Sequence, residues 1–340
     1  MPKIPLIAAA LIGLLCAVWQ PSWAQTNASN PPNNLSSADS LPATAQKVYT
    51  GIYLMNLYDI NMNEHSFYAD FYIWFRWKGD IDPTQIEFVN VIEKWAITQN
   101  AFQDTIKVLS DGYNYTGMRV EGRFYHPFAL ERFPLDRHQL SLQIEHTQQP
   151  YDSLAYVPDT QPFVLHNRFQ MPGWSIVGTT AYPLRHTYNS NFGDIDEGEG
   201  NYGSCIFSLE IARPANYFLL KLLLPLLVVI LASLGAMLIF PTYVDARISL
   251  PIGGLLTMVF LQQSYSDALP DVGYMVLMDK IYVLGYLLIS VVMLKVVLTG
   301  NRVKLQKRII NLQSLSRNDV IMAVLFFVLF LVATALLSLW

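Results

Sequence analysis

Cysteine and charge are both scarce in this chain of 340 residues. It has two cysteines, Cys16 and Cys205, and its charged residues make up 14% of the sequence, whereas about a quarter is usual for a soluble globular protein. The low charge, together with a hydrophobic content of 52%, indicates a membrane protein. The net charge is -4 and no basic run follows the pattern of a nucleic-acid-binding surface. Nucleic acid is therefore not an expected partner.

The sequence also lacks the motifs of catalysis. A membrane-anchored enzyme would need a nucleophile, an acid–base pair or a metal cluster, and no such motif stands outside the long apolar segments. The six histidines have no metal-ligand spacing. His126, His138 and His146 are candidate pH sensors, although we expect them to be ordinary surface residues. We expect neither enzyme activity nor a cofactor.

The first 24 residues have the pattern of a secretory signal. Lys3 supplies the positive region, residues 4–19 the apolar region, and Ser22-Trp23-Ala24 a cleavage site of small residues. We predict a signal peptide over residues 1–24, with an uncleaved anchor as the alternative. Residues 25–44 are rich in Asn, Ser and Pro, which predicts a disordered leader.

Removal of the signal would also remove Cys16 and leave Cys205 as the one remaining cysteine. No disulfide can then form within the chain, although the following residues enter an oxidising compartment.

Residues 45–215 have short runs of β-branched and aromatic residues between turn residues, a pattern typical of a β-sandwich. A helical turn is expected only near residues 85–91. The clearest predicted strands are residues 51–57, 67–77, 113–125, 139–146, 175–182 and 202–211.

Residues 216–340 contain four apolar segments that are long enough to cross a membrane. The predicted helices are residues 217–240, 246–266, 273–298 and 320–340. Pro225 should kink the first of them.

The charges between these segments predict the topology. The linker between the third and fourth helices has a single acid, Asp319, and five basic residues: Arg302, Lys304, Lys307, Arg308 and Arg317. The positive-inside rule places this linker in the cytoplasm and both termini outside. The predicted fold is thus an α+β membrane protein, with an exported N-terminal β-sandwich followed by a four-helix transmembrane bundle.

The second apolar segment has an uncharged stripe. Its positions recur at steps of four and three, so they share one face of a helix: Ser249, Gly253, Leu256, Phe260, Gln263 and Asp267. The stripe is polar at both ends and apolar in the middle. Several copies around an axis would form a water-filled path with a hydrophobic constriction at Leu256 and Phe260. The alternative is a buried helix of a transporter bundle.

Local motifs resemble those of the pentameric ligand-gated ion channels, the Cys-loop receptor superfamily. Residues 126–140 resemble the signature loop, with Phe133-Pro134-Leu135-Asp136 at its core. His126 and Leu140 stand where animal receptors have two bridging cysteines, a departure that is typical of bacterial members. Further matching motifs are Gly173-Trp174-Ser175-Ile176, Arg213-Pro214-Ala215-Asn216-Tyr217, Asp245-Ala246-Arg247-Ile248, Leu256-Thr257-Met258 and Ala268-Leu269-Pro270. The similarity covers residues 48–340.

This resemblance implies a prokaryotic, homopentameric ligand-gated channel. It would lie in the bacterial inner membrane with its β domain in the periplasm. Its partners would be the lipid bilayer, inorganic ions and a small-molecule or ionic agonist. The competing hypotheses are a membrane-anchored periplasmic sensor or binding protein without conduction, and an anion-selective channel of the same fold.

The resemblance also assigns the pore. Ser249, Gly253, Leu256, Phe260 and Gln263 would line it, with Leu256 at the central hydrophobic gate. Pro251 departs from most relatives and cannot donate a hydrogen bond to the carbonyl of Arg247. It should either bend the inner half of this helix or be accommodated by packing against neighbouring helices without an effect on function.

Asp245 is the candidate for charge selectivity. Anion-selective relatives have Pro-Ala-Arg at the inner mouth, whereas this chain has Asp245-Ala246-Arg247, which resembles cation-conducting bacterial members. Five carboxylates in a ring would attract cations and repel anions. The alternative role for Asp245 is that of a helix N-cap.

Coupling between the β domain and the pore is assigned by resemblance to Phe133, Pro134, Asp136, Arg213 and Pro270. Asp136 and Arg213 would form the acid–base pair at this interface, with Phe133, Pro134 and Pro270 packed around it. The alternative is a solvated acid and a snorkelling arginine.

The ligand site of the family lies between neighbouring β domains. The positions that match it are Tyr72, His146, Tyr188 and Tyr202, although the Trp that stands near His146 in relatives is absent. Residues 189–201 include Asp194, Asp196 and Glu199. These carboxylates could bind calcium or attract an amine; the alternative is a solvated loop tip.

Overall fold

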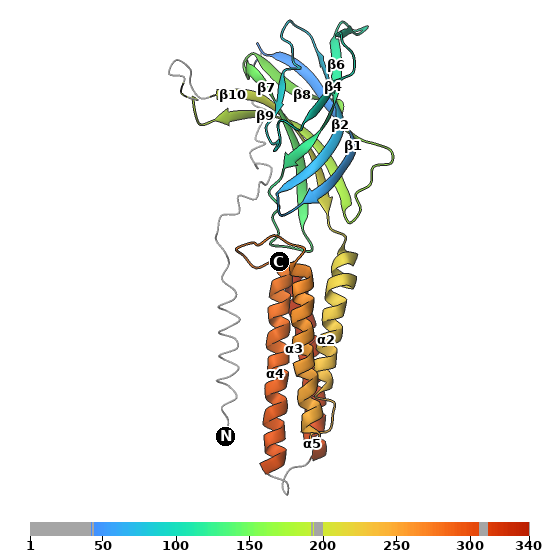
Figure 1. Ribbon diagram of the computed structural model, residues 1–340, viewed down its shortest axis with the longest axis vertical. Helices are drawn as coiled ribbons and strands as arrows, with labels where there is room; N and C mark the ends of the chain where they lie inside the picture. Colours follow the sequence, from blue (N-terminus) through green and yellow to red (C-terminus); the bar gives the residue numbers. More distant parts are fainter. Residues whose placement is uncertain (1–41, 43, 192, 194–199, 306–311, 340) are drawn as a thin grey trace. The chain divides into compact units, whose positions relative to one another are not determined.

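The computed structural model describes residue 42 and residues 44–191, 193, 200–305 and 312–339 (Figure 1). The predicted signal peptide, nearly all of the predicted leader, and Asp194, Asp196 and Glu199 lie outside the described residues. The calcium hypothesis therefore stays a prediction from the sequence.

The N-terminal part of the described chain forms two β-sheets (Figure 1). The six-stranded sheet has the path β4-β6-β2-β1-β8, with β5 also paired to β6, and the four-stranded sheet has the order β3-β7-β10-β9. Only the β1–β8 pair is parallel among the described strands. The strands are β1 Gln46–Asn61, β2 Ser66–Trp77, β3 Ile86–Phe88, β4 Thr98–Ala101, β5 Lys107–Val108, β6 Asn114–Tyr125, β7 Arg137–Pro150, β8 Leu154–Leu165, β9 Ser175–Tyr188 and β10 Gly200–Ala212.

Aromatic side chains join the two sheets into a sandwich. The ring of Phe71 on β2 lies 5.7 Å from that of Phe88 on β3 in a T-shaped contact, and Phe163 on β8 meets Phe207 on β10 at 6.5 Å. Aromatic edge-to-face pairs at these distances add to the free energy that the buried area supplies. The predicted β-sandwich is confirmed.

All six predicted strands are present, but the sequence missed β3, β4, β5 and β8. The expected helical turn near residues 85–91 was wrong, because Ile86–Phe88 instead pairs with β7. β8 contains Pro158 and Pro162, which lack a backbone N–H and argue against a strand. Its parallel register with β1 shifts between Thr50 and Ile52, opposite the segment that carries the prolines.

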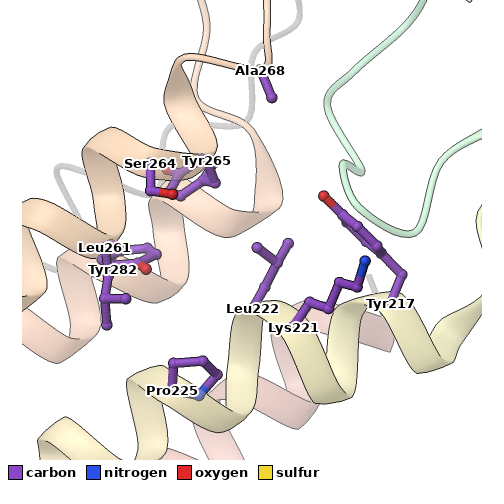
Figure 2. Close-up of a pocket in the computed structure, with 9 residues that line it drawn as sticks. All are labelled: Tyr217, Lys221, Leu222, Pro225, Leu261, Ser264, Tyr265, Ala268 and Tyr282. Atoms are coloured by element: carbon purple, nitrogen blue, oxygen red, sulfur yellow. The ribbon is translucent and has the colours of Figure 1, made fainter.

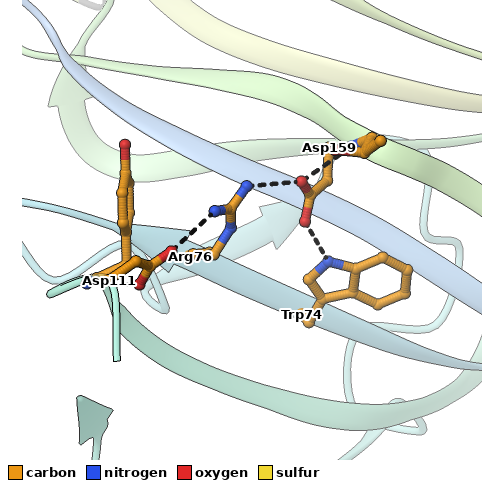
Figure 3. A network of polar contacts seen from close by, with 6 residues as sticks. Trp74, Arg76, Asp111 and Asp159 are labelled. Atoms are coloured by element: carbon orange, nitrogen blue, oxygen red, sulfur yellow. Dashed lines mark hydrogen bonds and ion pairs between the residues drawn. The ribbon is translucent and has the colours of Figure 1, made fainter. Parts of the chain in front are cut away.

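A polar cluster braces the six-stranded sheet (Figure 3). Arg76 lies between two carboxylates, 2.9 Å from Asp159 and 3.5 Å from Asp111, and the indole N–H of Trp74 donates to Asp159 over 3.1 Å. Burial alone would raise the pKa of Asp159, but hydrogen bonds from Trp74, Thr160 and Arg76 outweigh it and lower the pKa. This cluster ties β2 to β8 and to the turn that contains Asp111.

Four helical segments among the described residues are long and apolar enough to cross a membrane. The first begins as a π-helix, η1 Tyr217–Leu223, and continues as α2 Leu224–Gly235; α3 Val244–Ser266, α4 Leu277–Leu305 and α5 Leu312–Leu339 follow. The mean hydropathy of α3 is lower than that of the other three. The helix with the predicted stripe is thus the least apolar of the four.

The two prolines of the membrane segment have different surroundings. Pro225 follows η1, in which the chain widens so that the N–H of Leu224 reaches the carbonyl of Leu219. A π-turn is a usual way to place a proline that cannot donate to the preceding turn. Pro251, in contrast, is buried inside α3, whose helical assignment runs without a break from Val244 to Ser266.

Candidate functional site

The predicted stripe of α3 is exposed along its whole length in the single chain. Leu256 and Phe260 retain 59% and 66% of their accessible surface. The other exposed members are Ser249, Gly253, Gln263 and Asp267. Gln263 donates to Asp267 over 2.6 Å, which links the two polar residues at one end of the stripe.

The opposite face of α3 packs closely against the neighbouring helices. A side chain added at Gly254 would lie 2.0 Å from the Ser233 hydroxyl of α2, and one added at Gly285 of α4 would lie 2.7 Å from Met258. The buried residues of α3 are Arg247, Pro251, Gly254, Met258 and Tyr265. The stripe is therefore not the helix face that holds this chain's own bundle together.

Asp245 is exposed in the first turn of α3. The helix N-cap is Tyr243, which makes no side-chain capping bond, so the N-cap alternative for Asp245 was wrong. A carboxylate in the first turn still lies at the positive end of the helix dipole, which favours its charge. Its effect on permeating ions stays a prediction.

Asp136 and Arg213 form a buried ion pair below the sandwich. Arg213 Nε lies 2.8 Å from Asp136 Oδ1, and the side chains retain only 11% and 1% of their accessible surface. His138 Nε2 contacts the other carboxylate oxygen at 2.7 Å. The guanidinium also lies over the rings of Phe133 at 4.9 Å and Trp174 at 4.3 Å. The alternative of a solvated acid and a snorkelling arginine was wrong.

The loop that carries Asp136 contacts the start of α4. The carbonyls of Glu131 and Phe133 accept hydrogen bonds from the backbone N–H groups of Leu277 and Met278, over 2.9 and 3.2 Å. The N–H of Leu130 donates to the Tyr274 hydroxyl over 3.1 Å. Backbone hydrogen bonds thus connect the β domain to the helix that packs against α3. Pro134 is buried in this loop, and Pro270 is half-buried after α3.

A small cavity lies beside this junction, with side chains of η1 and α2 on one side and of α3 and α4 on the other (Figure 2). Its volume is about 140 Å³. Lys221 reaches over the ring of Tyr217 at 5.5 Å, and both face the part of α3 that contains Ser264 and Tyr265. The end of α3 that lies nearer the β domain therefore has space on one side.

Two of the three candidate histidines are buried, and His126 is half-buried. His138 and His146 each expose only 3% of their surface, so that expectation was wrong. The ring of His126 lies 4.7 Å from Phe128 and 5.6 Å from His138. Burial, with smaller contributions from His138 and His65, lowers the pKa of His126 to about 3. His126 is consequently neutral at physiological pH.

Two of the predicted ligand-site residues come together at the edge of the four-stranded sheet. The rings of Tyr188 on β9 and Tyr202 on β10 meet edge to face at 5.8 Å. The Tyr188 hydroxyl donates to the carboxylate of Glu145 on β7 over 3.1 Å, and His186 contacts the other oxygen. Burial and the nearby Glu145 carboxylate raise the pKa of Tyr188.

The sequence reasoning missed Glu145 and His186. The side chain of Glu145 retains 1% of its accessible surface, an unusual position for a carboxylate without a partner. The only sign of the site in the sequence was that Glu145 lies inside the predicted strand 139–146. This did not predict burial, because every strand has an exposed side on which an acid can stand.

Tyr72 and His146 are placed differently. Tyr72 belongs to the six-stranded sheet, where its ring lies 5.7 Å from Phe102 and 5.7 Å from the guanidinium of Arg119. His146 uses both ring nitrogens: Nε2 meets the carbonyl of Asp82, and Nδ1 accepts from two backbone N–H groups, each at 3.0 Å. Both ring nitrogens of His146 are thus engaged in holding its own loop.

No cluster of three or more His, Cys, Asp or Glu side chains that could hold a metal occurs within residues 44–191, 193, 200–305 and 312–339. Cys205 is buried in β10, and burial raises the pKa of its thiol.

The described chain is that of a multi-pass membrane protein: a β-sandwich leads into four helices able to cross a membrane, with an exposed stripe on the second helix and a buried acid–base pair at the junction. This arrangement resembles that of the pentameric ligand-gated ion channels.

The comparison with known proteins agrees with this resemblance. No family model matches the chain. The chain is similar to a protein of Gloeobacter violaceus named as a proton-gated ion channel, with 24% identity over 312 residues that cover 85% of this chain and 80% of that protein.

Proposed function

We propose that this chain forms a homopentameric, cation-selective channel of the bacterial inner membrane, opened by an extracellular ligand. The observation that carries the proposal is the exposed stripe of α3, which lies opposite the face that packs against α2 and α4.

The chemistry of the stripe favours a water-facing surface over lipid. Its ends expose Ser249, Gln263 and Asp267. Ser249 and Gln263 donate hydrogen bonds within this segment, but the carboxylate of Asp267 would still face hydrocarbon, where a charge is costly. Around a five-fold axis these ends would face water. Leu256 and Phe260 would form an apolar constriction that closes the path by dewetting.

The charge of this path follows from Asp245. It is exposed in the first turn of α3, one helical turn before Ser249 of the stripe. Five copies would place a ring of carboxylates at the inner mouth. Such a ring concentrates cations and repels anions, which is the basis of the proposed selectivity.

The junction supplies a route from ligand to gate. Asp136 and Arg213 hold the end of β10 to the signature loop, and that loop holds the start of α4. A ligand that favours one arrangement of the β domain would shift these packed elements as a unit, and α3 would move with α4.

The candidate ligand site contains Glu145, His186, Tyr188 and Tyr202. A carboxylate among aromatic rings suits an amine, and the imidazole of His186 is held against the same carboxylate. The Gloeobacter relative is named for gating by protons, so protons and amines are the first agonists to test. The neutral His126 is not the proton sensor that this proposal needs.

The test is the reversal potential of the reconstituted protein in asymmetric salt, with amines, calcium and acid screened as agonists. Wild type should reverse near the cation equilibrium potential, and Asp245→Asn should shift it towards zero. Asp271→Asn, which changes an exposed acid outside the stripe, is the matched control and should behave like wild type. An anion-selective wild type, or unchanged selectivity in Asp245→Asn, would refute the assignment of Asp245. A protein without conductance under all these conditions would instead favour the sensor hypothesis.

A further inference from the structure

The four membrane helices are joined by a buried cluster of ions at the ends that lie away from the β domain. Arg247 of α3 and Asp319 of α5 form its centre, with Arg247 Nη2 2.5 Å from Asp319 Oδ2. Lys295 of α4 approaches Asp319 Oδ1 at 3.6 Å. The side chains of Arg247 and Asp319 retain 1% and 0% of their accessible surface. Two opposite charges in such a dry position must be paired to be tolerated.

Arg247 of α3 also caps the C-terminus of the first membrane helix. Its Nε donates over 2.9 Å to the carbonyl of Ala236, the C-cap residue of α2. The last carbonyls of a helix lack partners and carry the negative end of its dipole, so a guanidinium there is stabilised. Arg247 is thus held by α2 and α5 on the side of α3 that faces the bundle.

Asp245 points the other way. Residues two apart on a helix differ by about 200° in direction, so Asp245 and Ser249 lie nearly opposite Arg247. The accessibilities agree, since Asp245 and Ser249 are exposed and Arg247 is buried. In the sequence the charges of Asp245 and Arg247 cancel; in the fold they occupy opposite faces of one helix.

We propose that Asp319 is a selectivity-determining residue, because it holds the charge of Arg247 away from the ion path and leaves Asp245 to set the electric field at this mouth. This inference rests on the proposed pore and goes beyond it: a residue of α5, which lines no part of the proposed path, decides which ions pass. Lys295 lies on α4 and supplies a second cation to the same carboxylate. Loss of Asp319 therefore leaves two cations unpaired.

The first test compares reversal potentials of wild type and Asp319→Asn in asymmetric salt. The amide cannot neutralise Arg247, whose guanidinium then gains by moving towards water and the ring of Asp245. A unit charge about 10 Å from a permeating ion, at an effective dielectric constant of about 20, changes permeability roughly tenfold. Because the same charge raises the energy of a cation and lowers that of an anion, the ratio of cation to anion permeability should fall by the square of that factor, about a hundredfold, in Asp319→Asn.

Two further variants separate this inference from a merely structural role. Arg247→Gln leaves Asp319 paired with Lys295, and it should keep the selectivity of wild type because the charge it removes is already hidden. The double variant Arg247→Gln with Asp319→Asn should recover the selectivity that Asp319→Asn loses. A defect of folding or assembly would not be rescued as a change in ion preference.

The contradicting results are equally specific. Wild-type selectivity in a conducting Asp319→Asn channel overturns the inference while leaving the proposed channel intact. A clear rise in cation preference in Arg247→Gln also overturns it, because the arginine charge would then already reach the path; this variant decides the matter if Asp319→Asn does not assemble. An anion-selective wild type overturns the inference together with the proposed selectivity, and a non-conducting wild type refutes the proposed function itself.

Discussion

Replacing Asp136 by Asn should loosen the junction between the β domain and the membrane helices. The variant keeps the shape of the side chain but leaves Arg213 without its partner in a site where Asp136 retains 1% and Arg213 11% of their accessible surface. Removing one member of a buried ion pair costs about 3–5 kcal/mol. Arg213 keeps its contacts with Phe133 and Trp174, each worth about 0.5–2 kcal/mol, so we expect the lower end, about 3 kcal/mol.

The assay is thermal unfolding of the purified protein in detergent, followed by tryptophan fluorescence because Trp174 packs on Arg213. A loss of about 3 kcal/mol corresponds to a fall of roughly 6–12 °C in the midpoint for a chain of this size. A double-mutant cycle with Arg213→Gln should give a coupling free energy of about 2 kcal/mol.

The matched control is Glu210→Gln. Glu210 pairs with Arg137 at 3.6 Å on the neighbouring strands, but those side chains retain 35% and 68% of their accessible surface. A pair this exposed contributes less than about 1 kcal/mol. If Asp136→Asn costs no more than Glu210→Gln and the coupling free energy is near zero, the junction does not depend on this ion pair.

Three other predictions concern the gate, the buried histidine and the ligand site. Leu256→Ser should wet the constriction and lower the agonist concentration for half-maximal current by about tenfold, whereas Leu255→Ser, on the packed side of α3, should not; equal shifts in both would refute the gate. The unfolded chain binds a proton on His126 below pH 6.5, whereas the folded chain does not until about pH 3. The free energy of unfolding should therefore decrease as the pH is lowered through this window, by up to about 1.4 kcal/mol per pH unit. His126→Gln should make this pH dependence weaker, and an unchanged dependence in urea titrations would contradict the burial of His126. Glu145→Gln should shift the agonist or proton dose-response by at least about tenfold and leave ion selectivity unchanged. Glu87 is an exposed acid on β3, opposite Glu145 in the register of the two strands. Glu87→Gln should change neither the dose-response nor the selectivity.

Much of the fold could be predicted because its patterns are local. Strand β7 alternates buried and more exposed side chains over residues 137–144, and each membrane helix is an apolar run of sufficient length. The stripe of α3 was also readable, since a helical period needs only neighbouring residues. Strand β8 escaped prediction because its two prolines are poor strand formers, and only its pairing with β1 identifies it.

The ends of the helices show why local patterns are insufficient. The predicted fourth helix began at residue 320, whereas α5 begins at Leu312. Arg317 and Asp319 interrupt the apolar run, and counting charges placed Asp319 in the linker. In the fold its partner is Arg247, 72 residues earlier in the chain, and this distant contact lets the helix include the acid.

The candidate site residues also divide into those that a sequence motif indicated and those that only the contacts in the fold reveal. Asp136 and Arg213 were paired in advance only because the surrounding motifs resemble a known family. Glu145 and His186 had no motif, since what distinguishes them is burial and mutual contact across β7 and β9. His138 and His146 were misassigned to the surface for the same reason: His138 packs against Trp174 and His146 contacts the carbonyl of Asp82, and both partners are distant in the sequence.

The most direct test of the central claim is thiol modification of single cysteines along α3 during recordings of ion current, in a background in which Cys205 is buried. Gly253→Cys and Leu256→Cys should react with a charged methanethiosulfonate reagent and change the current, whereas Gly254→Cys and Met258→Cys, on the packed face, should not. Modification confined to Gly254 and Met258, or no effect on current at any of these positions, would contradict a pore lined by the exposed stripe.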